Sequence, residues 1–182
     1  MSRPPRKLTP KSLENGALFY LQRFSTSAEN LRRVLLRRVE RSARIHDTDR
    51  DEGAELVDRL VERFQAVGLV DDRTYAEGRA LSLHRRGAAS RVIRARLRQK
   101  GVGDGDIEAA LAAVAEANPD GDLAAAVNLA RRRRLGPFRA GATDDDRHRR
   151  DLAALARAGF SYDIARRVLS GEAGQEMESR NR

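Results

Sequence analysis

Apolar residues recur along this chain at helical spacing, and single glycines repeatedly interrupt the pattern. Leu56, Leu60 and Phe64 lie four residues apart on one helix face, and the run stops at Gly68, which suits the left-handed position after a helix. Alternation of apolar and polar residues, the mark of a half-buried strand, is nowhere sustained. The pattern predicts about nine helices of ordinary length, each too short to be stable without packing on its neighbours.

One of these glycine stops occurs twice in the same setting. The segment Leu97-Arg-Gln-Lys100-Gly101-Val102 returns 58 residues later as Leu155-Ala-Arg-Ala158-Gly159-Phe160, and Ile107 and Ile164 follow at nearly equal distances. The helices therefore group in threes, and the predicted fold is all-α, with three tandem three-helix units forming an extended, curved helical-repeat array. The expected segments are a disordered basic arm at 1–16, unit 1 at 17–68, unit 2 at 71–117, unit 3 at 121–171 and a disordered tail at 172–182.

Composition excludes several classes of protein. The chain has no cysteine, which excludes disulfides, thiolate metal sites and a cysteine nucleophile. Its 36 basic residues against 27 acidic ones give a net charge of +9, which indicates an anionic partner. No apolar run approaches membrane-spanning length, and residues 1–7 lack the apolar segment of a secretory signal. We therefore expect a cytoplasmic protein with no membrane partner.

The charges are segregated along the chain. Residues 73–100 carry a net +8, whereas residues 103–122 carry six acids and no base. At helical spacing Arg91, Arg94 and Arg98 share a face. A similar stripe is formed by Arg33, Arg37, Arg41 and Arg44. Either the stripes follow a polyanion, or they are solvated faces balanced by nearby acids. Aromatic residues do not alternate with the arginines, so stacking on unpaired bases is not expected.

No catalytic or metal-binding constellation is present in the sequence. His46, His84 and His148 are widely separated and are expected at the surface. The acidic triplet 144–146 is more simply explained as favourable charge at a helix start than as a magnesium site. The chain is therefore expected to be a non-enzymatic protein without a cofactor or metal.

Two polar segments are typical of helix N-termini. The sequence Thr26-Ser-Ala-Glu29 fits a capping box in which the Thr26 hydroxyl accepts from the first turn. Asp71 and Asp72 both offer capping oxygens to the following helix. Tyr75 and Ala76, on that helix, are expected to pack against Phe64 and Leu69.

The central segment also carries a family resemblance. Gly68-Leu-Val-Asp71-Asp72-Arg-Thr-Tyr75-Ala76 is similar to the G-x-L-D-D-x-x-[FY]-A segment of RecX-type regulatory proteins. Weaker matches to the family's outer units extend the resemblance over about residues 17–170. The residues that carry the central motif are Gly68, Leu69, Asp71, Asp72, Tyr75, Ala76, Leu97, Lys100, Gly101, Ile107 and Leu111.

The resemblance implies a function as well as a fold. RecX-type proteins form three tandem three-helix units, bind the RecA recombinase filament, lodge in its helical groove and curb its ATPase and strand exchange, and some also bind DNA. By that resemblance we expect a monomeric regulator of RecA in DNA repair and recombination. The candidate residues for binding the filament or DNA phosphates are Arg85, Arg86, Arg91, Arg94 and Arg98 in unit 2, with Arg33, Arg37 and Arg41 in unit 1.

Two alternatives stay open from the sequence. Residues 85–101 could form part of a helix-turn-helix in a sequence-specific DNA-binding regulator, which would be expected to dimerise. Alternatively, the repeat could be a scaffold for another acidic protein, with no effect on a recombinase.

Overall fold

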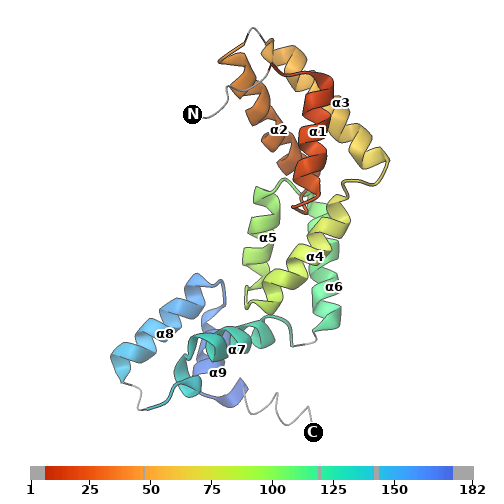
Figure 1. The fold of residues 1–182 in the computed structure, drawn as a ribbon. Helices are drawn as coiled ribbons and strands as arrows, with labels where there is room; N and C mark the ends of the chain where they lie inside the picture. Colours follow the sequence, from red (N-terminus) through yellow and green to blue (C-terminus); the bar gives the residue numbers. More distant parts are fainter. Residues whose placement is uncertain (1–6, 47, 119, 142–143, 174–182) are drawn as a thin grey trace.

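The computed structural model describes residues 7–46, 48–118, 120–141 and 144–173, and this part of the chain is built from helices without a strand. The predicted all-α helical-repeat array is confirmed (Figure 1). The elements are α1 (Pro10–Leu21), α2 (Ala28–Ala43), α3 (Arg50–Ala66), α4 (Asp72–Arg85), α5 (Ser90–Gln99), α6 (Asp104–Ala117), α7 (Gly121–Arg133), the short 3-10 helix η1 (Gly136–Phe138), α8 (Asp145–Arg157) and α9 (Tyr162–Leu169).

Three separate apolar cores follow one another along the molecule. One includes Leu31 and Leu35 of α2, the second Ile93 and Leu97 of α5, and the third Leu155 of α8. We propose to treat α1–α3, α4–α6 and α7–α9 as units 1, 2 and 3, because each set encloses its own core. The units follow one another in a curved, elongated arrangement in which α2, α5 and α8 lie along the same side (Figure 1).

The repeated glycine stop is a repeated backbone structure. Gly101 and Gly159 have φ angles of 77° and 101°, in the left-handed region that favours glycine. The Val102 N–H donates to Leu97 O at 3.1 Å, and the Phe160 N–H donates to Leu155 O at 3.2 Å. These are the hydrogen bonds of a Schellman motif, so α5 and α8 end in the same way.

The predicted caps of two helices are corrected. Ser27, not Thr26, caps α2, and its hydroxyl accepts from the Asn30 N–H at 3.2 Å. Asp71 alone caps α4, by accepting from the Thr74 N–H at 2.9 Å. The prediction that Asp72 also caps α4 is wrong, because its carboxylate is directed at unit 1 instead.

The boundaries of the predicted arm and tail are also corrected. Helix α1 begins at Pro10, inside the predicted arm, because Thr9 and Ser12 form a reciprocal capping box. Leu13, also within that arm, is fully buried in the first core. Ala173, within the predicted tail, is buried in the third core. Residues 1–6 and 174–182 lie outside the described residues.

The predicted packing of Tyr75 and Ala76 on Phe64 and Leu69 is wrong. Ala76 is buried in the second core with Tyr75 packed against it, whereas Phe64 belongs to the first core. The side chain of Leu69 is 52% exposed. Tyr75 and Ala76 therefore pack within unit 2, on the other side of the unit boundary from Phe64.

His84 is buried, contrary to the prediction that the histidines lie at the surface. Its ring Nε2 lies 3.1 Å from Gly121 O, at the junction of α4 and α7. This contact gives His84 a structural place between units 2 and 3.

Both junctions between units contain the same hydrogen bond, from a backbone N–H at a helix start to an aspartate of the next unit. The Asp72 carboxylate accepts from the Ala28 N–H at 2.7 Å, and the Asp122 carboxylate accepts from the Ser90 N–H at 2.9 Å. In each case an aspartate in the first turn of a unit's first helix accepts a hydrogen bond from the N-terminus of the second helix of the preceding unit. Gly101 then packs against Glu29 at that same N-terminus. The junctions therefore fix the array and bring residues of neighbouring units together.

An arginine-lined cleft between units 2 and 3

A cleft of about 440 Å³ lies where α4 and α5 of unit 2 meet α7 and α8 of unit 3. Six of the residues that line it are arginines, and none is an acid. We call it the arginine cleft and define it by these side chains: Arg79, Arg86, Arg96, Arg132, Arg133 and Arg157.

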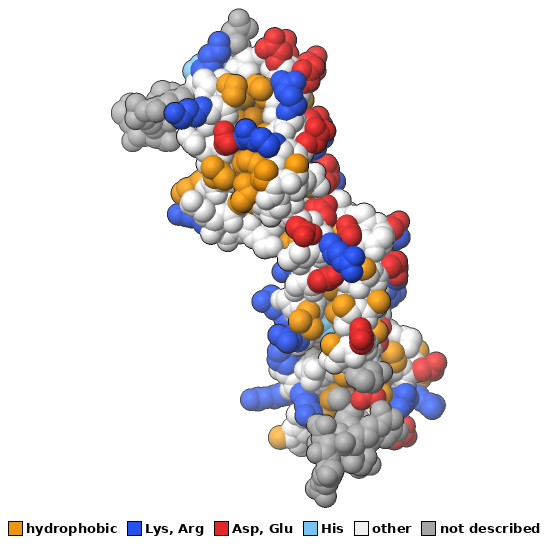
Figure 2. Space-filling view, turned by 90° about the vertical axis from the view of Figure 1, so that its right-hand side faces the viewer, with side chains coloured by type: hydrophobic (Ala, Val, Ile, Leu, Met, Phe, Trp, Pro, Cys, Tyr) orange, Lys and Arg blue, Asp and Glu red, His pale blue; other side chains and the backbone are white. Residues whose placement is uncertain are grey.

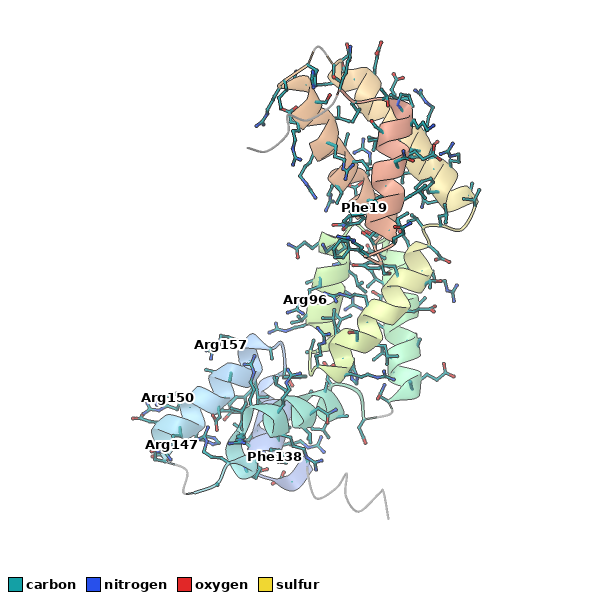
Figure 3. All side chains as sticks on the ribbon, in the orientation of Figure 1. Phe19, Arg96, Phe138, Arg147, Arg150 and Arg157 are labelled. Carbon is teal, nitrogen blue, oxygen red and sulfur yellow. The ribbon has the colours of Figure 1, made fainter. Side chains whose placement is uncertain are left out.

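Each wall of the cleft comes from a different helix. Arg79 lies on α4, Arg96 on α5 and Arg157 at the end of α8. Figure 3 labels Arg96 and Arg157 on these neighbouring helices, and Figure 2 shows Lys and Arg side chains projecting from the left-hand edge of the lower half. The floor is apolar, with buried Leu83 and Leu129. The arginine stems can therefore lie on apolar surface while their guanidinium groups reach solvent.

A glycine at the base of the cleft allows the two units to approach closely. Gly87 has a φ of 75°, and a Cβ placed on it would come within 2.9 Å of Ala125 O and 2.7 Å of the Leu129 Cβ. Only glycine suits this position, because any other residue would be strained at this φ and its Cβ would collide with α7. The position of α7 against the end of α4 is thus fixed by this residue.

Most of the cleft arginine side chains make no hydrogen bond or ion pair within the described part of the chain. Arg132 donates to Arg86 O at 2.7 Å. The side chains of Arg79, Arg86, Arg96, Arg133 and Arg157 make neither an ion pair nor a hydrogen bond with any described residue. Several unpaired guanidinium groups around one cleft create a positive potential that attracts an anion. Their planar forks suit phosphate or carboxylate oxygens.

The stripe predicted on α5 is engaged within the protein rather than open. Arg94 forms a two-pronged pair with Glu108, at 2.7 and 3.0 Å, and holds the pKa of that carboxyl below its ordinary value. Arg98 pairs with Asp104 at 2.8 Å and lowers the pKa of that carboxyl. A role for these two arginines in partner binding stays a prediction.

Arg91 is also engaged, at the junction of α5 with α8. Its guanidinium group donates to Gly159 O at 2.7 Å and to Ala156 O at 3.2 Å. It therefore satisfies carbonyl groups at the end of α8. Both ends of α5 contact neighbouring units. Helix α5 therefore does not project freely, as the recognition helix of a helix-turn-helix would.

The remaining predicted arginines divide between junction and open surface. Arg33 pairs with Glu29 at 2.8 Å and donates to Gln99 O at 2.7 Å, so it ties unit 1 to unit 2. Arg37, Arg41 and Arg85 are exposed, and no described residue bonds to their side chains. Of all the predicted candidates, only Arg86 lies in the arginine cleft.

Sequence reasoning missed five members of the cleft. Arg79, Arg96, Arg132, Arg133 and Arg157 come from four helices of two units, and only the junction brings them together. One usable signal was present, the run of four consecutive arginines at 131–134 that closes a helix. Their number exceeds what favourable charge at a helix end requires.

The structure bears on the other predicted chemistry as well. Asp144 caps α8 by accepting from the Arg147 N–H at 2.7 Å, as expected for an acid at a helix start. Among the described residues, no group of three His, Cys, Asp or Glu side chains is placed to hold a metal ion. None of the described helices is both long and apolar enough to cross a membrane.

The sequence and fold are similar to those of known proteins. A family model described as "RecX, second three-helix domain" matches residues 71–111. The regulatory protein RecX of Myxococcus xanthus (strain DK1622) is 44% identical over 167 residues, which is 91% of this chain and 88% of that protein. That of Agrobacterium fabrum (strain C58 / ATCC 33970) is 33% identical, over 86% of this chain and 80% of that protein.

Solved structures agree in fold. The crystal structure of RecX from Lactobacillus salivarius covers 88% of this chain and 94% of its own, with a TM-score of 0.62 and 22% identity. A second crystal structure of regulatory protein RecX gives the same TM-score and identity, covering 87% of this chain and 70% of that one. At this identity the likeness concerns the fold.

Proposed function

Because this chain belongs to the RecX family of regulatory proteins, we propose that it binds the RecA recombinase filament on DNA and lowers the filament's ATP hydrolysis and strand exchange. It acts as a monomer and by binding alone, without chemistry of its own. The proposal implies a cytoplasmic location, because that is where a bacterial recombinase meets DNA.

The observation that carries this proposal is the arginine cleft. A filament on DNA offers rows of phosphates and acidic side chains, and both are bound well by unpaired guanidinium groups. The side chains of five of the six cleft arginines have no hydrogen-bond or ion-pair partner among the described residues, so an anion would not have to displace an internal acid. Arg37, Arg41 and Arg85 add exposed positive charge elsewhere on the surface.

The elongated array supports the same partner. Three units joined end to end present their second helices along one side of the molecule (Figure 1). A solenoid-like array offers a long surface to a long partner, in place of one compact patch. A protein of this shape can contact several subunits of a filament and oppose their rearrangement.

The test is ATP hydrolysis by the cognate recombinase on single-stranded DNA, with this protein added in substoichiometric amounts. The proposal predicts a falling rate, and a parallel loss of strand exchange. An unchanged rate in the presence of folded protein contradicts inhibition. If the protein did not inhibit the recombinase but selected one duplex sequence from a random pool, a sequence-specific DNA-binding regulator would become the better-supported function.

A further inference from the structure

A second cavity, of about 490 Å³, lies between units 1 and 2. Three of its lining residues are aromatic, Tyr20, Phe24 and Tyr75, and they come from α1, the α1–α2 loop and α4. We call this cavity the aromatic pocket. The chain has only eight aromatic residues in all, so gathering three of them around one opening is a marked concentration.

Two of the three rings lie close to each other. The centroids of Tyr20 and Phe24 are 5.0 Å apart with 41° between the ring planes. Phe24 is 54% exposed although it lines the pocket, so much of it is accessible to solvent. Tyr75 is less exposed, and burial raises the pKa of its hydroxyl above the ordinary value.

Hydrogen bonds hold one wall of the pocket in place. The Asn30 amide donates to the Tyr20 hydroxyl at 3.3 Å and to the Thr26 hydroxyl at 2.7 Å. The Lys100 ammonium donates to the Asn30 carbonyl oxygen at 3.1 Å. This network positions the Tyr20 ring and places a positive charge at the pocket, with Lys100 donors left over for another acceptor.

The aromatic pocket adjoins the arginine cleft. Arg79 lines both cavities, and its guanidinium group has no bonding partner among the described residues. One turn of α4 thus lies between a set of aromatic rings and a set of arginines. A positively charged groove beside stacking rings is the arrangement that binds single-stranded nucleic acid.

We propose that the aromatic pocket takes one unpaired nucleobase of single-stranded DNA, with the adjoining phosphates on Arg79 and Lys100. The base stacks on Phe24 and the neighbouring tyrosines, and the strand continues along α4 toward the arginine cleft. This inference rests on the DNA contact in the proposed function and extends it, because stacking distinguishes an unpaired strand from a duplex. It replaces the expectation from the sequence that base stacking plays no part.

The pocket can be altered without disturbing the fold. Phe24→Ala removes a half-exposed ring outside the helices. Gly78 lines the pocket, and a Cβ placed on it meets nothing within 4 Å, so Gly78→Leu fills the pocket and raises helix propensity in α4. Phe19→Ala is the matched control, because Phe19 is 52% exposed and is not among the residues that line the pocket. Figure 3 labels Phe19 on α1.

The experiment measures binding of labelled oligodeoxythymidine, and of the same strand with abasic sites, by fluorescence anisotropy without any recombinase. The wild type should bind the base-containing strand at least about five-fold more tightly than the abasic strand. This factor corresponds to the lower end of the range for stacking of one base on an aromatic side chain. Phe24→Ala and Gly78→Leu should lose this preference and keep the affinity for the abasic strand. Phe19→Ala should behave as wild type.

Three results would overturn the inference. The first is equal binding of both strands by the wild type. The second is an unchanged preference in both pocket variants. The third is a pocket variant that keeps its preference for bases but binds the recombinase filament more weakly, which would assign the pocket to a protein side chain. None of these results depends on whether the protein inhibits ATP hydrolysis.

Discussion

At the residue scale, several side chains serve a helix other than their own. Asp72 belongs to α4 but bonds the first turn of α2, and Asp122 belongs to α7 but bonds the first turn of α5. Gly101 ends α5, and it also leaves space for Glu29 of α2. Such residues contribute to the contact between units as well as to the elements that contain them.

The glycine stops allow these two roles to be separated. Gly68 and Gly101 have φ angles of 73° and 77°, but a Cβ on Gly68 meets nothing within 4 Å, whereas one on Gly101 runs into Glu29. Gly68→Ala should cost about 1–2 kcal/mol of unfolding free energy, the strain of a left-handed alanine. Gly101→Ala should cost clearly more. Urea unfolding measures both, and equal losses would mean that the junction contact at Gly101 contributes nothing.

The two adjacent aspartates should respond to pH in opposite directions. Burial raises the pKa of Asp72, so the folded state holds its proton more tightly and the ionised group lowers stability as pH rises from about 4. Asp72→Asn keeps the acceptor for the Ala28 N–H and should gain stability relative to wild type as the pH rises above about 4. Asp72→Ala loses the acceptor and should cost about 1 kcal/mol.

Asp71 is the control for that experiment. Its pKa is lowered, first by the Thr74 N–H and then by the Thr74 hydroxyl. Its stabilising effect is therefore present at neutral pH and is lost as pH falls through the lowered pKa. Asp71→Asn should be destabilising near pH 7 and nearly neutral in acid. Denaturation curves at several pH values that moved in the same direction for both variants would refute this assignment.

At the scale of elements, the sequence predicted the helices well because each signal is local. Apolar spacing and the glycine stops locate α5, α6, α8 and α9, and the repeated Schellman motifs follow from Leu97–Val102 and its counterpart. The start of α1 was missed because three prolines near the N-terminus resemble a disordered arm, although Pro10 occupies a favourable first-turn position. The sequence pattern could not show which arginines are unpaired, because their pairing depends on residues of other helices.

The loop before α8 is held by a buried acid. Asp151 is 3% exposed, and it accepts from the Gly136 N–H at 2.9 Å and from the Arg139 guanidinium at 2.9 Å. Asp151→Ala leaves both donors without their acceptor and should cost about 1.5–3 kcal/mol, as for hydrogen bonds to a charged group. Thermal unfolding checks this value. A loss below about 0.5 kcal/mol, typical of surface sites, would show that the loop is held in another way.

At the scale of the whole molecule, both proposed binding sites lie where units meet. Neither the arginine cleft nor the aromatic pocket belongs to one unit, and each lies at a junction between two. The sequence predicted a basic helical array and, through its motif, the family. It did not place Arg96 beside Arg157, because 60 residues and a change of unit separate them.

Salt dependence measures how many phosphates the array contacts. For a single strand, each contact adds about 0.7 to the slope of log affinity against log salt concentration. The double variant Arg96→Glu with Arg157→Glu should lower that slope by about 1.4 if both arginines contact phosphates. An unchanged slope with unchanged affinity would place the strand elsewhere on the protein.

The most direct measurement compares this cleft variant with wild type in recombinase ATP hydrolysis on single-stranded DNA. The control is Arg59→Glu with Arg73→Glu, which changes the net charge equally at exposed arginines paired with Glu55 and Glu77, outside the cleft. We predict that wild type and control lower the rate at the same concentrations, and that the cleft variant needs at least about ten-fold more protein. Equal inhibition by the folded cleft variant would contradict the assignment of the arginine cleft as the surface that binds the filament.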